Sequence, residues 1–422
     1  MINKSRSTRY SIFLFFICLG LCPAELVQRF TLQNGPAPFH GLPLSVDIEG
    51  LVSEADFDNL VMYEVRGNAT LPMQSQFQNE LNAQIWFEPL KPIAAGETVI
   101  LELHKGKAEH RSFVSARMDD QTITLCSEGN NILSYYHALH PVPEGVDPVY
   151  RRSAFIHPLY SPKGHVLTQI QPADHYHHYG IWNPWTKTHI EGKEVDFWNL
   201  NKKQGTVRFA DLLSTASGSV FAGFKVLQEH VQFLPEGKER VAMNEVWNVR
   251  AFPAVVESPV WIIDLTCTLY NNLAVPIELD QYRYGGGLGF RATEQWTKDN
   301  CSVLTSEGKK RAEADGTRAR WCDINGGFND TKQTSGILFL SHPANREHPE
   351  PMRVWPENSV GGKGEMFFEF CPIRHKDWVL QSGKEYVLKY RMIVYDGKLK
   401  PETMEALWQN YTEPPVISRR TD

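Results

Sequence analysis

Short runs of β-branched and aromatic residues recur along the whole chain, and such runs are typical of β-strands. The clearest runs occupy residues 99–104, 241–249, 261–270, 336–340, 366–370 and 386–395. Only residues 401–411 predict a helix, because a proline opens the segment and Met404, Leu407 and Trp408 share one helical face. The pattern of apolar positions therefore predicts an all-β protein.

The length of the chain predicts two β-domains. Its 422 residues exceed what one ordinary core usually holds. Short strands within residues 25–112 predict a small N-terminal β-sandwich. Residues 113–422 predict one large antiparallel structure, in which so many strands must close into a barrel or pack as two broad sheets.

Residues 1–24 have the organisation of a secretory signal peptide. Lys4, Arg6 and Arg9 precede an apolar run that ends at Cys22 and two small residues. The run is too short to span a bilayer, and no later segment is apolar for long enough, so we expect a secreted or periplasmic protein without a transmembrane segment. Residues 19–22 loosely resemble a lipoprotein signal, which leaves a lipid anchor at Cys22 as an alternative.

The net charge of the chain argues against partners that bind by bulk negative charge, but it leaves local basic pockets open. The net charge of −6 becomes −9 once the leader, with three basic residues and no acid, is removed. Without a basic cluster, such a surface does not favour nucleic acid. The five cysteines after the leader lack metal or redox spacing. We expect either one or two disulfides, with Cys301 and Cys322 the nearest pair, or five buried thiols.

The most informative segment is residues 174–185, Asp-His-Tyr-His-His-Tyr-Gly-Ile-Trp-Asn-Pro-Trp, which Asp-Phe-Trp follows at residues 196–198. Imidazole is the side chain best suited to proton exchange near neutral pH, so His175, His177 and His178 are the candidate catalytic residues. If the segment is extended, His175 and His177 lie on one face and His178 on the other.

Two other interpretations of these histidines stay open. His175 and His177 could ligate a metal, with a third ligand from His157, His342 or Asp196. Alternatively, the imidazoles form structural hydrogen bonds in a rigid loop. The sequence therefore leaves any metal or cofactor unknown.

Candidate substrate-binding residues surround this segment. The indoles of Trp182, Trp185 and Trp198 could stack on a sugar ring or belong to the core, and the turn-like residues 183–184 favour Trp185 as a surface platform. His157 is a further candidate contact.

Later in the chain, Arg283 and Arg291 flank three glycines and could bind a carboxylate or sulfate, or form structural ion pairs. Tyr282 and Tyr284 could act as acid or base, or pack. His342 and Asn345 begin a loop after a strand and could contact substrate or stabilise the turn.

These segments together carry a resemblance. Residues 155–164, 174–182 and 196–198, followed by residues 284–291, 341–346, 390–391 and 396–397, are similar in order to the signature of the PmoA-like family of bacterial proteins. The chain has Tyr176 and Tyr179 where many members carry Pro and Arg. The resemblance implies a large β-supersandwich similar to sugar epimerases and polysaccharide lyases, often with a small N-terminal β-domain, and an association with carbohydrate breakdown. The oxygenase activity in the family's name does not suit a chain without spanning segments.

We therefore expect a secreted carbohydrate-active enzyme of lyase, hydrolase or epimerase type, with histidine acid/base chemistry in a Trp-lined cleft. A non-catalytic glycan-binding protein is the alternative, and a structural β-protein with a histidine-stabilised loop is a third. The sequence leaves open the sugar, the reaction and the oligomeric state.

Overall fold

The computed structural model describes residues 25–421, except residues 81, 108–112 and 329–330. The expected signal peptide, with Cys22, lies outside the described residues. Antiparallel strands dominate and helices are few, which confirms the all-β fold. Within the described part of the chain, no helix is both long and apolar enough to cross a bilayer.

The N-terminal domain is a small sandwich of two sheets. Its five-stranded sheet has the order β29-β1-β7-β3-β4 and its three-stranded sheet the order β2-β6-β5. The bounds are β1 (Glu25–Gln33), β2 (Leu44–Asp47), β3 (Leu60–Arg66), β4 (Ala69–Pro72), β5 (Ser75–Asn79), β6 (Ala83–Phe87), β7 (Thr98–Lys105) and β29 (Val416–Arg419), with the short helix η1 (Glu54–Asn59).

The large domain contains a nine-stranded sheet with the order β22-β25-β26-β20-β12-β11-β10-β9-β8. The bounds of its strands are β8 (Val114–Met118), β9 (Thr122–Ser127), β10 (Asn130–Tyr136), β11 (Phe155–Leu159), β12 (Ile181–Trp182), β20 (Gly289–Arg291), β22 (Arg318–Ala319), β25 (Glu350–Val354) and β26 (Phe367–Phe370).

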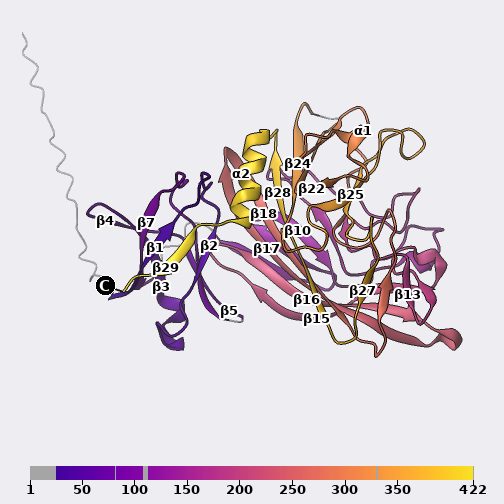
Figure 1. The fold of residues 1–422 in the computed structure, drawn as a ribbon, viewed down its shortest axis with the longest axis horizontal. Helices are drawn as coiled ribbons and strands as arrows, with labels where there is room; N and C mark the ends of the chain where they lie inside the picture. Colours follow the sequence, from indigo (N-terminus) through magenta and orange to yellow (C-terminus); the bar gives the residue numbers. More distant parts are fainter. Residues whose placement is uncertain (1–24, 81, 108–112, 329–330, 422) are drawn as a thin grey trace, which may run out of the picture.

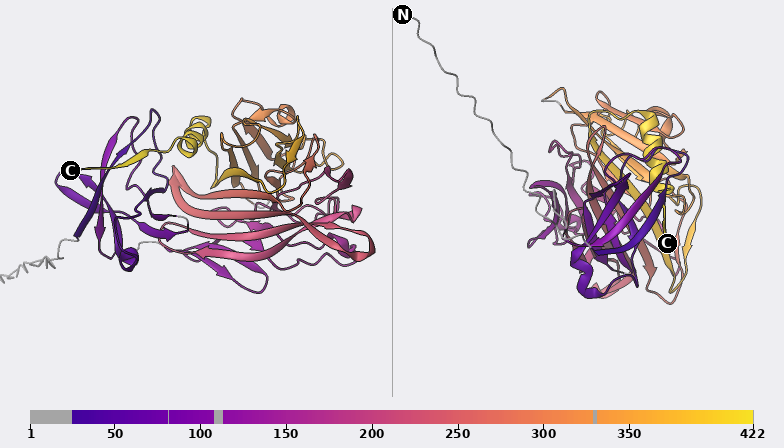
Figure 2. Two further views of the ribbon diagram at one scale, coloured as in Figure 1. Left: turned by 60° about the horizontal axis from the view of Figure 1, so that its bottom comes forward. Right: turned by 90° about the vertical axis from the view of Figure 1, so that its left-hand side faces the viewer.

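An eight-stranded sheet with the order β15-β16-β17-β18-β28-β24-β23-β21 packs against it. Its strands are β15 (Gly205–Ala216), β16 (Ala222–Phe233), β17 (Glu239–Val256), β18 (Ser258–Asn271), β21 (Cys301–Thr305), β23 (Trp321–Gly327), β24 (Thr334–Ser341) and β28 (Glu385–Asp396). The long strands of residues 205–256 form a curved layer in the left view of Figure 2.

A four-stranded sheet, of order β14-β13-β19-β27, and short helices complete the domain. These elements are β13 (Thr188–Ile190), β14 (Lys193–Val195), β19 (Ile277–Leu279), β27 (Trp378–Leu380), η2 (Pro148–Tyr150), η3 (Leu200–Lys202), η4 (Pro235–Gly237), α1 (Arg311–Ala314) and α2 (Pro401–Thr412). The predicted helix 401–411 is thus confirmed as α2, which buries Met404 and Leu407.

The chain returns to its starting domain at the end. Beyond α2, β29 pairs with β1, so that Ile417 lies opposite Leu32. In Figure 1 the C-terminal strand runs back from α2 into the N-terminal domain. The small domain is therefore built from residues 25–107 together with the C-terminal strand, a long-range pairing that the expected division at residue 112 does not include.

The five cysteines after the leader are buried free thiols. The expected pair is not bridged: Cys301 lies on β21 and Cys322 on β23, and both pack into the apolar core between the two large sheets. Burial raises the pKa of both thiols, that of Cys301 to about 12. The expectation of a Cys301–Cys322 disulfide was wrong, and the alternative of buried thiols is confirmed.

Gly286 is required by close packing in the large domain. Its φ of +74° lies in the left-handed region, and a Cβ atom here would lie 1.7 Å from Cζ3 of Trp185. We expect Gly286→Ala to lower the free energy of unfolding by about 3–5 kcal/mol, from the combined cost of the backbone conformation and an overpacked core. Urea denaturation would measure this change.

Gly129→Ala is the matched control for this substitution, because Gly129 has a φ of +86° and open space around it. Its expected cost is only about 1–2 kcal/mol, from the backbone alone. An equal loss in the free energy of unfolding for Gly286→Ala and Gly129→Ala would contradict the packing argument.

Candidate functional site

The candidate site lies on the outer face of the nine-stranded sheet. Side chains alternate along each strand, so Ile156 on β11 and Ile181 on β12 enter the core between the two large sheets. Their neighbours Phe155 and Trp182 turn the other way. There they form a second apolar cluster, the aromatic bed, whose buried members are Phe155, Tyr179, Trp182, Trp198, Leu200, Trp355 and Phe367.

The histidine segment folds as two consecutive turns above this bed. The N–H of His175 donates to the carbonyl of Pro172 at 2.9 Å, and the N–H of His178 donates to the carbonyl of His175 at 3.0 Å. The segment is therefore not extended, and the alternation that would place His178 on the opposite face does not apply. The three rings form one group, with centroids separated by 4.7 Å (His175–His178), 4.8 Å (His177–His178) and 5.4 Å (His175–His177).

The imidazole of His175 is accessible, with a side chain 33% exposed. Its Nδ1 lies 2.7 Å from Oδ2 of Asp174, so the carboxylate favours the tautomer with a proton on Nδ1. Nε2 is then left as a proton acceptor, and no described residue hydrogen-bonds to it. His175 and Asp174 thus form an oriented acid/base pair.

Arg291 connects this pair to the sheet. Its side chain is fully buried, with Nη2 3.5 Å from Oδ1 of Asp174 and in a close ion pair with Glu365. Although burial raises the pKa of Asp174, the Arg291 charge and the hydrogen bond from His175 outweigh it and lower that pKa below its usual value. Asp174 therefore stays ionised and holds His175 in place.

The other two histidines are neutral at pH 7. Burial, together with the charge of His175, lowers the pKa of His177 to about 4. Burial and the neighbouring His177 lower the pKa of His178 well below its usual value. With only 1% of its surface exposed, His178 supports the other rings and cannot contact a substrate.

The indoles form the bed beneath the histidines. Trp198 packs edge-on against His177 and face-on against His178, and its Nε1 donates to the carbonyl of His177 at 3.2 Å. Trp182 packs against His178 and Trp198. Trp185 is fully buried in the core beside Trp378. The expectation that Trp185 is a surface platform was wrong, because its loop turns inward against Gly286.

Tyr284 presents a second ionisable group at the same bed. Its ring packs against Trp198 and Phe367 and is half-buried. Its hydroxyl oxygen accepts from Nη2 of Arg353 and from Nε1 of Trp355, each at 3.1 Å. Two donors already occupy the oxygen, so the phenol's own proton points elsewhere.

The remaining predicted site residues divide into two groups. Arg291 is inside the site, and Arg283 is exposed at its edge, with its guanidinium 5.3 Å from the Tyr284 ring. His342 instead packs on Tyr411 of α2. Asn345 exchanges two hydrogen bonds with the backbone of Lys389, which is the turn-stabilising role.

His157 lies on β11 beside Gly180, where its Nδ1 is 2.9 Å from the Thr168 hydroxyl. Burial lowers its pKa to about 4, with a smaller effect from the charge of His140. The rings of the three clustered histidines are in contact with one another, whereas no ring contact to His157 is found in the described part of the chain.

Sequence reasoning missed the residues that hold this site together. Glu365, Arg353 and Trp355 lie nearly 200 residues after the histidine segment, and their partners depend on which strands become neighbours. The sequence did carry one signal, since Glu365 directly precedes the predicted strand 366–370.

A metal site at the histidines gains no support from the geometry. Among residues 25–421, excluding the few positions named above, no group of three or more His, Cys, Asp or Glu side chains is arranged to hold a metal ion. Asp196, a possible third ligand, is fully buried and accepts from the backbone N–H groups of Trp198 and Asn199. It therefore fixes the loop that carries Trp198.

Comparison with known proteins gives one result for this region. Residues 122–409 match the model of a family described as Family of unknown function (DUF6807). The matched region includes every residue of the site described above. No curated protein matches the chain.

The buried neutral histidines predict that the protein becomes less stable in mild acid. His157 and His177 have pKa values of about 4 when folded and 6.5 as free side chains. As the pH falls from 6.5 to 4, the unfolded chain binds protons that the folded chain does not. Each ring therefore lowers the free energy of unfolding by up to about 1.4 kcal/mol per pH unit.

Urea denaturation at pH 7 and pH 5 tests this loss. His157→Asn removes one titrating ring. Between pH 7 and pH 5, the free energy of unfolding of this variant should therefore fall by about 2 kcal/mol less than that of the wild type. The exposed His375 is the control, and His375→Asn should leave the difference unchanged. An unchanged pH dependence in His157→Asn would contradict the assignment.

Proposed function

The chain belongs to the DUF6807 family, whose function is unknown, and on the chemistry of its site we propose that it is an exported carbohydrate-active enzyme. The reaction proposed is proton transfer at a sugar, of the lyase or epimerase type. The single observation that carries the proposal is the accessible Asp174–His175 pair, which lies on the same aromatic bed as the phenol of Tyr284.

His175 is the proposed proton acceptor. Nδ1 faces Asp174, so Nε2 is free to take a proton from a substrate carbon or hydroxyl. Asp174 then stabilises the imidazolium that forms. Arg291 and Glu365 keep Asp174 in position, and they act as positioning residues because both side chains lie behind it.

Tyr284 is the proposed second proton-transfer group. A phenol can donate its proton to a leaving sugar oxygen or to the opposite face of a carbanion. The oxygen left behind keeps the two hydrogen bonds that it already accepts, from Arg353 and from Trp355. The Arg353 guanidinium lies 4.9 Å from the ring centre and is itself ion-paired with Asp315 at 2.7 Å.

The arrangement of carboxylates favours these reactions over hydrolysis. Glycoside hydrolysis typically uses two carboxyl groups on opposite sides of the scissile bond. Here Asp174 is occupied by His175 and Arg291, and Glu365 is buried against Arg291. A third carboxylate, Asp315, is ion-paired with Arg353 and Arg374. The proposed proton-transfer groups are therefore an imidazole and a phenol.

A sugar suits the surface around these groups. The half-buried rings of Tyr150 and Tyr176 lie 5.6 Å apart, next to the histidines, and offer C–H stacking surfaces with hydroxyl groups. These tyrosines take the role first expected of the indoles. The basic and apolar order of residues 4–21 supports export, and the similarity to the PmoA-like family supports a role in carbohydrate breakdown. Both stay predictions.

Turnover of oligosaccharides by His175→Ala tests the proposal. The wild type is first screened against neutral and uronate-containing oligosaccharides for a new product. We expect His175→Ala to lower kcat by about 10²- to 10⁴-fold, because the proton acceptor is lost. Tyr284→Phe should lower kcat to a similar extent, with little change in KM.

His189→Ala is the matched control. His189 also pairs with an aspartate, Asp280, at 2.8 Å and has a similar exposed fraction, but it lies on β13 outside the site. Unchanged turnover in His175→Ala would refute the proposed role. Saturable sugar binding without any product, in both the wild type and His175→Ala, would instead identify a non-catalytic glycan-binding protein.

A further inference from the structure

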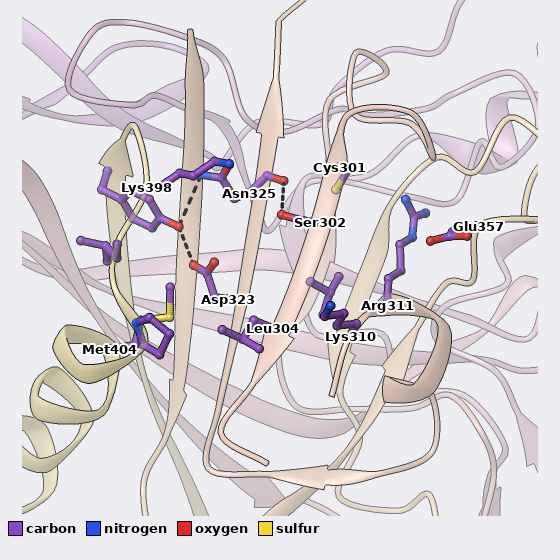
Figure 3. Close-up of a pocket in the computed structure, with 14 residues that line it drawn as sticks. Cys301, Ser302, Leu304, Lys310, Arg311, Asp323, Asn325, Glu357, Lys398 and Met404 are labelled. Carbon is purple, nitrogen blue, oxygen red and sulfur yellow. Dashed lines mark hydrogen bonds between the residues drawn. The ribbon is translucent and has the colours of Figure 1, made fainter. Parts of the chain in front are cut away.

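A cavity of about 510 Å³ lies beside β21, the edge strand of the eight-stranded sheet. Its lining includes Asp323, on the face of that sheet that points away from the core between the two large sheets, and Cys301 and Val303, which pack into this core. Strands β21, β23 and β28 form its floor, and the start of α2 forms one wall. Figure 3 shows Asp323 between Leu304 and Met404 in this space.

Asp323 occupies a position where strand alternation calls for an apolar residue. Two neighbours of Asp323 belong to the apolar cluster that α2 covers. Trp321 lies on the same face of β23, and Leu338 on β24 is the cross-strand partner of Asp323. Asp323 is only 6% exposed. Because burial penalises the ionised form, its pKa is raised to about 7. A carboxyl group at this buried position lowers the free energy of unfolding. Residues that lower stability in this way are typical of functional sites.

The surrounding residues are built around this carboxyl group. The hydroxyl of Tyr395 donates to Oδ1 of Asp323 at 2.6 Å. The tyrosine reaches it by crossing β24 at Gly336, where a Cβ atom would lie 2.3 Å from the Tyr395 hydroxyl oxygen. Asn325 is held beside them by a 2.7 Å hydrogen bond from Nδ2 to the carbonyl of Gly397.

Two acceptors in this cluster remain open to the cavity. In the part of the chain that the structure describes, no donor hydrogen-bonds to Oδ2 of Asp323 or to Oδ1 of Asn325. Both residues line the cavity, as Figure 3 shows. Two neighbouring oxygen acceptors suit adjacent hydroxyl groups of a ligand, and the apolar Leu304, Leu399 and Met404 suit its C–H faces.

The charged residues of the cavity favour an anion. Lys310 and Lys398 line it, and no described carboxylate lies within ion-pair distance of either ammonium group. Arg311 adds a third positive charge. Its guanidinium donates to the backbone carbonyls of Trp355, Gly364 and Glu365 and not to a carboxylate. Glu357 is the one acid besides Asp323 among the lining residues.

We propose that this cavity is a second ligand site, which binds a hexuronate, a monosaccharide that carries a carboxylate. Its hydroxyl groups donate to Asp323 and Asn325, and its carboxylate faces Lys310 and Lys398. The cavity is large enough for one or two sugar rings, since small-molecule sites commonly measure roughly 300–1,000 Å³. The site is separate from the histidines, and this inference does not depend on the proposed reaction there.

Titration calorimetry of the full chain with D-galacturonate and D-galactose tests the site. We expect saturable galacturonate binding and at least ~10-fold weaker galactose binding, the equivalent of one charged contact. Replacement of both ammonium groups, Lys310→Gln with Lys398→Gln, should weaken galacturonate binding by ~10-fold or more and leave galactose unchanged.

Asp323→Asn separates a binding role from a structural one. If the carboxyl group serves the ligand at a cost in stability, the variant should bind both sugars more weakly and melt at a higher temperature. A lower melting temperature with unchanged binding would overturn the proposal.

Two further variants complete the test. Lys309→Gln, next to the cavity residues but not among them, should bind galacturonate as the wild type does. His175→Ala should also retain binding. Loss of binding in His175→Ala, or an unaffected double lysine variant, would place the sugar elsewhere, and absence of any galacturonate binding would likewise overturn the inference.

Discussion

The candidate site depends on the neutralisation of one buried charge. Arg291 is the last residue of β20, and its guanidinium lies against the Trp355 ring, 4.9 Å from its centre, with no exposed surface. A charge in such a place is tolerated only when it is paired. Asp174 and Glu365 supply the pairing from two separate loops. The position of the histidine turns, and therefore of His175, follows from this requirement.

The same requirement explains why the site was predictable only in part. The strands could be predicted because alternating or continuous apolar runs depend on the local sequence, and residues 386–395 became β28 as expected. The histidine segment was identified by its composition, yet its conformation was not. Strand alternation would have separated His178 from His175. Instead, the N–H of His175 donates to the carbonyl of Pro172 and the N–H of His178 to the carbonyl of His175, which closes two turns and brings the rings together. Those turns are favoured by Asp174 reaching Arg291, more than 100 residues further along the chain.

The tryptophans illustrate a second limit of sequence reasoning. An indole has both a large apolar surface and an N–H group, so composition alone suits either a sugar platform or a core. The close approach of Gly286 to the Trp185 ring decides between them, because the glycine leaves room for the indole to insert inward. Trp182 and Trp198 are similarly covered, by the histidines themselves. Burial in a β-protein of this size depends on contacts between distant strands, which a single sequence does not reveal.

The pairing of β29 with β1 has a consequence for the order in which the protein matures. Domains usually fold as they emerge during synthesis or translocation, beginning with the N-terminal one. Here the five-stranded sheet of the first domain lacks its edge strand until residues 416–419 are available. The small domain thus begins to emerge before the large one and is completed after it, and β1 keeps an unpaired edge throughout the synthesis of the large domain. An exposed strand edge is a template for unwanted pairing. A nascent chain of this architecture should therefore need protection of that edge until residues 416–419 are available.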